Sequence, residues 1–208
     1  MNKIETLVIA TGNPSKKKRY AKYFETYVPK VIGLADLGFS EKPTETGATA
    51  EENAGIKAKF YFEKLHLPVF SEDESLFVDF LPKDQQPGVH VRRINGKDDA
   101  TDEELIAYWE EKLKGIPESD RLGRWHIALA LSLPNGSIHI ESLEYPIKFF
   151  TPTSKIRLPG WPMSSLEGPL RFNKPHSELT AEELESLEEE DTLKTSKQIS
   201  NLLKSISH

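Results

Sequence analysis

The sequence contains no cysteine, which excludes disulfide bonds, thiolate metal sites and cysteine nucleophiles. It also lacks any apolar run near the ~20 residues that are needed to span a bilayer. The apolar stretch at residues 6–10 is too short for the core of a signal peptide. We therefore expect a cytoplasmic protein with no membrane partner.

An excess of basic residues is also missing. The chain has 27 Lys and Arg residues against 33 Asp and Glu residues, a formal net charge of −6. Global attraction to nucleic acid is therefore not expected. No internal repeat and no long linker interrupt the 208 residues, of which 37% are hydrophobic. We expect one α/β domain over residues 1–208, either undivided or built from two lobes.

The N-terminal region predicts a strand, a tight turn and a helix. Residues 7–10 are apolar, residues 11–16 read T-G-N-P-S-K, and Ser15 can cap the helix that follows. Four aromatic residues then recur at helical spacing: Tyr20, Tyr23, Phe24 and Tyr27. Free backbone N–H groups at such a helix start can bind an anion, and Lys16 lies at that position. The single glycine does not support a Walker loop.

The stretch at residues 69–79 places three consecutive acids, Glu72, Asp73 and Glu74, after an apolar lead-in. Buried carboxylates need a cationic partner. One interpretation is a strand that ends at a divalent metal and a phosphate chain. The other is a solvated turn between two strands, and this stretch by itself favours the turn.

The remaining chain predicts further regular elements. Residues 31–34 indicate a strand, and helices are expected from Thr49 and from Thr101, which begins a capping-box pattern. Asn53 and Lys57 share one face of the first of these helices, where a surface polar pair is the ordinary interpretation. Asn-Gly between two apolar runs predicts a hairpin over 125–133 and 138–147, and residues 180–207 have a helical composition.

Three motifs, taken together in order and spacing, resemble the inosine-triphosphate pyrophosphatase family. Residues 11–16 match its T-G-N-x-x-K motif, and residues 45–58 match E-T-G-x-T-x-x-E-N-A-x-x-K-A without a break. Residues 72–79 and 87–93 resemble its D-D-S-G-L-x-V-D and P-G-x-x-S-A-R motifs. The resemblance implies a long mixed β-sheet flanked by helices, two lobes with a cleft between them, and a homodimer. It also implies Mg²⁺-dependent hydrolysis of nucleoside triphosphates to monophosphate and pyrophosphate.

The resemblance also implies roles for individual residues. Asp73 matches the catalytic acid, which binds magnesium and helps to activate water, and Lys16 matches the catalytic lysine that binds the triphosphate. The expected metal ligands are Asp73, Glu45 and Glu72. The residues expected at the substrate are Thr11, Gly12, Asn13, Lys16, Lys57, Glu74, Arg93 and Trp161, the last as a stacking surface for the base.

Several positions depart from the family pattern. Glu74 replaces the serine of D-D-S-G, and Arg19 replaces the glutamate of K-x-x-E in the first helix. The aspartate expected after Trp161 is Pro162, and the S-H-R motif that reads the purine is not found. Two hypotheses therefore stay open: a pyrophosphatase with an undetermined base preference, or a non-catalytic relative that binds a nucleotide or a protein.

Overall fold

The computed structural model describes residues 4–158 and 160–204. Its helices and strands follow in the order β1 (Thr6–Ile9), α1 (Pro14–Phe24), β2 (Lys30–Gly33), α2 (Ala50–Leu65), β3 (Val69–Val78), α3 (Asp102–Lys112), β4 (Leu122–Ser132), β5 (Ile138–Phe149), β6 (Glu167–Pro169) and α4 (Ala181–Lys204). Short 3₁₀ turns lie at Ala35–Leu37, Lys83–Gln85, Glu118–Asp120, Pro162–Ser165, Leu170–Phe172 and His176–Glu178. Among the described residues, no helix is both long and apolar enough to cross a membrane.

The strands form one mixed sheet in the order β2-β1-β3-β4-β5-β6. β1 pairs in parallel with both β2 and β3, whereas β5 and β6 are antiparallel. β4 and β5 are neighbours in the sheet, and a turn at Gly136, whose φ is +82°, connects them. The predicted mixed sheet and the Asn-Gly hairpin are therefore confirmed.

The chain divides into two compact units. The first holds the described residues of 1–74, 127–143 and 192–208, and the second holds those of 75–126 and 144–191. β3, β4, β5 and α4 each continue from one unit into the other. The two lobes predicted from the sequence agree with this division, while a single domain over residues 1–208 and a cleft between the lobes stay predictions.

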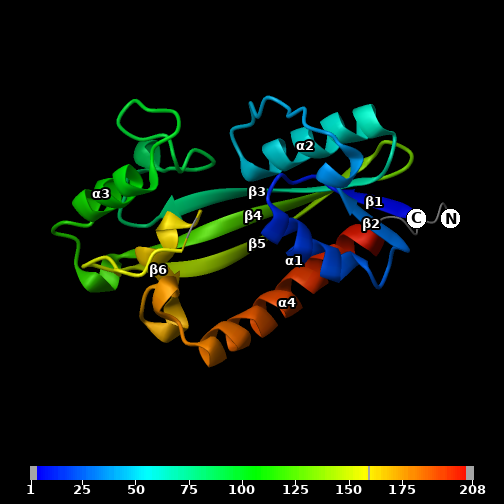
Figure 1. The fold of residues 1–208 in the computed structure, drawn as a ribbon. Coiled ribbons are helices and arrows are strands. Elements are labelled where there is room, and N and C mark those ends of the chain that lie inside the picture. Colours follow the sequence, from blue (N-terminus) through cyan, green and yellow to red (C-terminus); the bar gives the residue numbers. More distant parts are fainter. Residues whose placement is uncertain (1–3, 159, 205–208) are drawn as a thin grey trace. The chain divides into compact units, whose positions relative to one another are not determined.

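In the first unit, α1 and α2 cover opposite faces of the sheet (Figure 1). On the α1 side, the Phe70 ring packs against Tyr20 and Phe24, with ring centroids 4.8 and 4.9 Å apart. On the α2 side, Val69 belongs to a separate apolar cluster with Tyr61. Adjacent residues of β3 thus face different helices, as the two-residue period of a strand requires.

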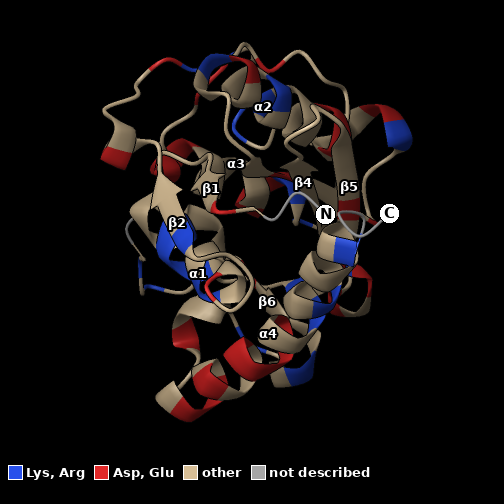
Figure 2. Cartoon of the chain, turned by 90° about the vertical axis from the view of Figure 1, so that its right-hand side faces the viewer, with Lys and Arg blue, Asp and Glu red and all other residues tan. Residues whose placement is uncertain are grey.

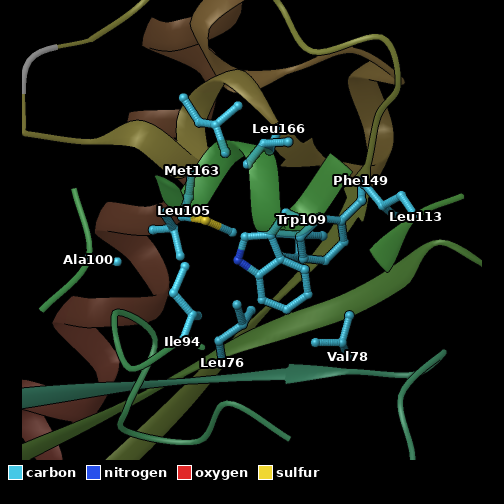
Figure 3. Close-up of a cluster of buried hydrophobic side chains, with 12 residues drawn as sticks. Leu76, Val78, Ile94, Ala100, Leu105, Trp109, Leu113, Phe149, Met163 and Leu166 are labelled. Atoms are coloured by element: carbon cyan, nitrogen blue, oxygen red, sulfur yellow. The ribbon is translucent and has the colours of Figure 1, made fainter. Parts of the chain in front are cut away.

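The second unit has its own apolar core, which Figure 3 shows around the indole of Trp109. Trp109 lies on α3 and packs against Phe149 with ring centroids 5.3 Å apart. Leu76 and Leu166 complete the surroundings of the indole. The capping box predicted at Thr101 is present, and it holds the start of the helix that carries Trp109.

The N-terminal half of α4 carries a long acidic face. The helix begins with Glu182 and Glu183 in its first turn, where acids stabilise the helix dipole. Figure 2 shows red segments along α4, and the residues of 182–191 are mostly exposed or half-buried. The sequence interpretation of this acidic run as a solvated helix face is confirmed.

Candidate active site

The three acids at residues 72–74 lie inside β3, which continues to Val78. Both interpretations of this stretch were therefore wrong in one respect: there is no turn here, and the strand does not end at the acids. Strand alternation explains how carboxylates are accommodated inside a sheet. Glu72 and Glu74 point toward α1, and Asp73 points toward α2, where lysines balance their charge.

The turn between β1 and α1 is closed by its own side chains. Asn13, not Ser15, caps the helix, and its Oδ1 accepts hydrogen bonds from the backbone N–H groups of Ser15 at 2.9 Å and Lys16 at 3.3 Å. Thr11 Oγ1 accepts a bond from the backbone N–H of Asn13 at 3.1 Å. The prediction of free N–H groups at this helix start is thus wrong for Ser15 and Lys16, because Asn13 occupies them.

Lys16 lies between two carboxylates of β3. Its Nζ donates to Glu72 Oε1 at 2.6 Å and to Glu74 Oε1 at 3.0 Å. Burial opposes the ammonium charge, but the two carboxylates outweigh it and raise the pKa of Lys16. Burial and the nearby Glu74 carboxylate raise the pKa of Glu72. Lys16 therefore carries its charge at neutral pH and stabilises a crowded acidic pair.

Glu72 is the better anchored of the two acids. Its side chain is 8% exposed, against 32% for Glu74. Tyr20 donates its hydroxyl to Glu72 Oε2 at 3.4 Å, and burial raises the pKa of Tyr20 well above its ordinary value, so the phenol keeps its proton. Arg19 in turn donates to the Tyr20 hydroxyl oxygen at 3.1 Å. Glu72 is consequently held from two sides.

Asp73 has separate partners on the α2 side. Lys57 Nζ donates to Asp73 Oδ1 at 2.6 Å, and Asn53 Nδ2 donates to Asp73 Oδ2 at 3.2 Å. Glu45 Oε2 lies 3.6 Å from the same lysine nitrogen. Lys57 and Asn53 are one helical turn apart, so both reach the same strand residue. The orientation of the Asp73 carboxylate is thereby fixed.

The loop before α2 is tied to this arrangement through Gly47. Its backbone N–H donates to Asn53 Oδ1 at 2.8 Å, so one amide side chain joins the loop to Asp73. A Cβ on Gly47 would lie 2.6 Å from Asn53 Oδ1 and 2.7 Å from Glu52 Cβ. Close approach therefore requires glycine here. α2 begins next to Thr49, where a helix start was predicted, and the Thr49 side chain caps it.

Asn53 is a site residue that the sequence interpretation missed. The pair of Asn53 and Lys57 was expected on the surface, but Asn53 is 3% exposed and Lys57 is half-buried. The burial of Asp73 in a strand was the missing information. The signal that could have found Asn53 was its spacing of four residues from Lys57 inside an unbroken motif.

The predicted metal ligands are not gathered in one place. Glu72 lies with Lys16 on the α1 side, whereas Asp73 and Glu45 share Lys57 on the α2 side. Within residues 4–158 and 160–204, no three acidic or histidine side chains form a group that could hold a metal ion. Asp73 and Glu45 do offer carboxylate oxygens. This donor type suits Mg²⁺, which takes one or two carboxylates and fills its remaining positions with water and phosphate oxygens.

Arg93 and Trp161 belong to the second unit. Arg93 Nε lies 3.8 Å from Asp98 Oδ1. Trp161 is 42% exposed, and its ring lies 4.3 Å from the ring of His176. Their predicted contacts with substrate stay predictions. The structure thus brings together Lys16, Glu72 and Glu74, and separately Glu45, Lys57 and Asp73.

Comparison with known sequences identifies the class of protein to which this site belongs. Residues 7–144 match the Ham1 family. A dITP/XTP pyrophosphatase of Thermoanaerobacter sp. (strain X514) is 35% identical over 146 residues, which are 67% of this chain and 72% of the relative. That of Bacillus subtilis (strain 168) is 38% identical over 129 residues, 61% of this chain and 63% of the relative.

The chain belongs to the Ham1 family. The resemblance to inosine-triphosphate pyrophosphatases is therefore confirmed, and with it membership of a family of hydrolases that act on acid anhydrides.

Solved structures show the same fold. A nucleoside-triphosphatase / dITP/XTP pyrophosphatase from Mycobacterium abscessus superposes with a TM-score of 0.71 at 25% identity, over 89% of this chain and 94% of that one. A HAM1 protein from Coxiella burnetii gives a TM-score of 0.74 at 24% identity, over 98% of each chain. The predicted α/β fold is confirmed.

Proposed function

We propose that this chain is a Mg²⁺-dependent nucleoside-triphosphate pyrophosphatase that hydrolyses ribo- or deoxyribonucleoside triphosphates to the monophosphate and pyrophosphate. The observation that carries the proposal is the Asp73 carboxylate, which Lys57 and Asn53 hold in one orientation on a buried strand. The relatives named dITP/XTP pyrophosphatases support non-standard purine nucleotides as the substrate class.

In this mechanism Asp73 accepts the proton of the attacking water, because its carboxylate is fixed while its lone pairs are not all used. Lys16 binds the phosphate oxygens from the α1 side of β3 and stabilises their charge, and the turn at Thr11, Gly12 and Asn13 lies beside it. Water displaces pyrophosphate from the nucleotide, and the leaving group takes the bridging oxygen. Mg²⁺, held by Asp73 and Glu45, would neutralise phosphate charge and polarise the phosphoryl group. Glu72 stays a predicted ligand.

A panel of nucleotides tests the proposal directly. The protein is incubated with Mg²⁺ and ITP, XTP, dUTP or each of the four common triphosphates, and pyrophosphate release is measured. We expect release from at least one nucleotide and none when Mg²⁺ is removed by a chelator. Pyrophosphate release from none of them, with nucleotide binding retained, would establish the second hypothesis, a non-catalytic nucleotide-binding relative. The ion pair between Glu74 and Lys16 favours that alternative, because Glu74 then takes the place of a phosphate at the proposed phosphate-binding lysine.

Three further expectations belong to this proposal. Family membership and resemblance support a homodimer, and sedimentation at several protein concentrations would test it. They also support a cytoplasmic location, which cell fractionation would test. Arg93 and Trp161 are proposed to contact the substrate, the latter by stacking on the base, and replacing Trp161 by alanine should then raise KM for the preferred nucleotide.

A further inference from the structure

Lys16 already has two anionic partners before any substrate binds. An ammonium group has three N–H donors, and two of them go to Glu72 and Glu74. A triphosphate that uses Lys16 must therefore compete with a carboxylate of the protein for the same nitrogen.

The two carboxylates differ in how easily they can leave. Glu72 is almost buried and also accepts the Tyr20 hydroxyl. Glu74 is about one-third exposed, and within the described residues Lys16 is its one partner by hydrogen bond or ion pair. Glu74 is consequently the group that can turn into water when phosphate arrives, because solvation offsets the loss of its partner.

Arg19 brings a second positive charge to this group of side chains. It donates to the Tyr20 hydroxyl, and that hydroxyl contacts Glu72, so a second cation lies next to the lysine and its two acids. Both Arg19 and Glu74 depart from the motifs that the rest of this region matches. The two departures have opposite charges, and the extra cation helps to offset the extra acid.

We propose that Glu74 is a built-in competitor of the triphosphate for Lys16, and that it lowers substrate affinity by holding the lysine in an ion pair. The inference rests on the proposed function for the identity of the natural ligand. It concerns binding, so Glu74 acts through Lys16 as a positioning residue and takes no part in the chemical step.

The test compares Glu74→Gln, which keeps the size of the side chain, with the unchanged protein. Inorganic tripolyphosphate is titrated by calorimetry at a fixed Mg²⁺ concentration. We expect Glu74→Gln to bind tripolyphosphate roughly tenfold more tightly. This lies between the small effect of losing an exposed ion pair and the larger effect of losing a buried hydrogen bond to a charged group. Glu74→Ser should act in the same direction, so a folding defect in one variant does not decide the result. Glu41→Gln is the matched control, because it removes a carboxylate from an exposed ion pair with Lys64.

Kinetics separate this role from a structural one. On the best nucleotide, KM should fall by a similar factor while kcat changes by less than about twofold, a pattern that loosened packing does not produce. The inference is overturned if both Glu74 variants bind tripolyphosphate with unchanged or weaker affinity. It is also overturned if neither the unchanged protein nor any variant binds tripolyphosphate. If no nucleotide releases pyrophosphate, only the proposed function is contradicted. The tripolyphosphate titration does not depend on turnover, so it still tests whether Glu74 competes for Lys16.

Discussion

Glu167 provides a test of how the second unit tolerates a buried acid. Its side chain is 3% exposed, and Glu167 Oε1 accepts a hydrogen bond from the indole Nε1–H of Trp125 at 3.4 Å. Burial raises the pKa of Glu167 from 4.5 to about 8, and the Trp125 bond offsets only part of this. At neutral pH the folded protein therefore keeps the carboxyl group protonated.

The sign of the stability effect follows from this proton. Between pH 4.5 and about 8 the folded chain binds the proton and the unfolded chain releases it, so the free energy of unfolding falls as pH rises through this window. One such group costs roughly 1 kcal/mol at pH 5, about 3 kcal/mol at pH 7 and about 4 kcal/mol at pH 8. Glu167→Gln removes this cost, since the amide stays neutral and its oxygen can still accept from Trp125.

Urea unfolding followed by tryptophan fluorescence measures the effect at pH 5, 6, 7 and 8. The stability gained by Glu167→Gln should grow by about 3 kcal/mol between pH 5 and 8. Glu103→Gln is the matched control, because it makes the same substitution at an exposed position on α3 of the same unit. A gain that is the same at all four pH values, or a loss that grows with pH, would contradict a buried, protonated Glu167.

Two predictions concern packing. Gly47→Ala should lower the free energy of unfolding by roughly 1–3 kcal/mol in urea titrations, because the new Cβ meets Asn53 and Glu52; an unchanged midpoint would show that the loop can shift freely. Trp109→Ala should cost about 3–5 kcal/mol because it empties the centre of the second core. Trp109→Phe should cost clearly less, since it also removes an indole N–H that finds no hydrogen-bond partner among the described residues; equal losses in the two variants would contradict this.

The local elements could be predicted because their signals are local. Thr49 and Thr101 cap helices as their sequence patterns indicate, and Asn135 with Gly136 forms the hairpin turn. The first helix was placed correctly but its cap was not, since Asn13 and Ser15 are both good caps and only Asn13 precedes the proline at the helix start.

The arrangement of the acids could not be read from the sequence in the same way. Three consecutive acids suggested a turn or a single metal cluster, because an isolated buried carboxylate is unfavourable. Lys16 on α1 and Lys57 on α2 pair with these acids and so allow them to lie in a strand. Both lysines are distant from the acids along the chain. Once the strand is known, the alternation of side chains along it explains why Asp73 points to the opposite face from Glu72 and Glu74. The family motifs pointed to these residues without showing that they lie on two faces of the strand.

The most direct test of the account is pyrophosphate release by Asp73→Asn on the best nucleotide of the panel. We predict that kcat falls by about 100-fold or more in an Asp73→Asn variant shown by circular dichroism to be folded, because the amide cannot accept the proton of water. Asp84→Asn, the same substitution at an exposed position of the chain, should retain full activity. Undiminished pyrophosphate release by a folded Asp73→Asn variant would contradict the assignment of Asp73 as the catalytic residue.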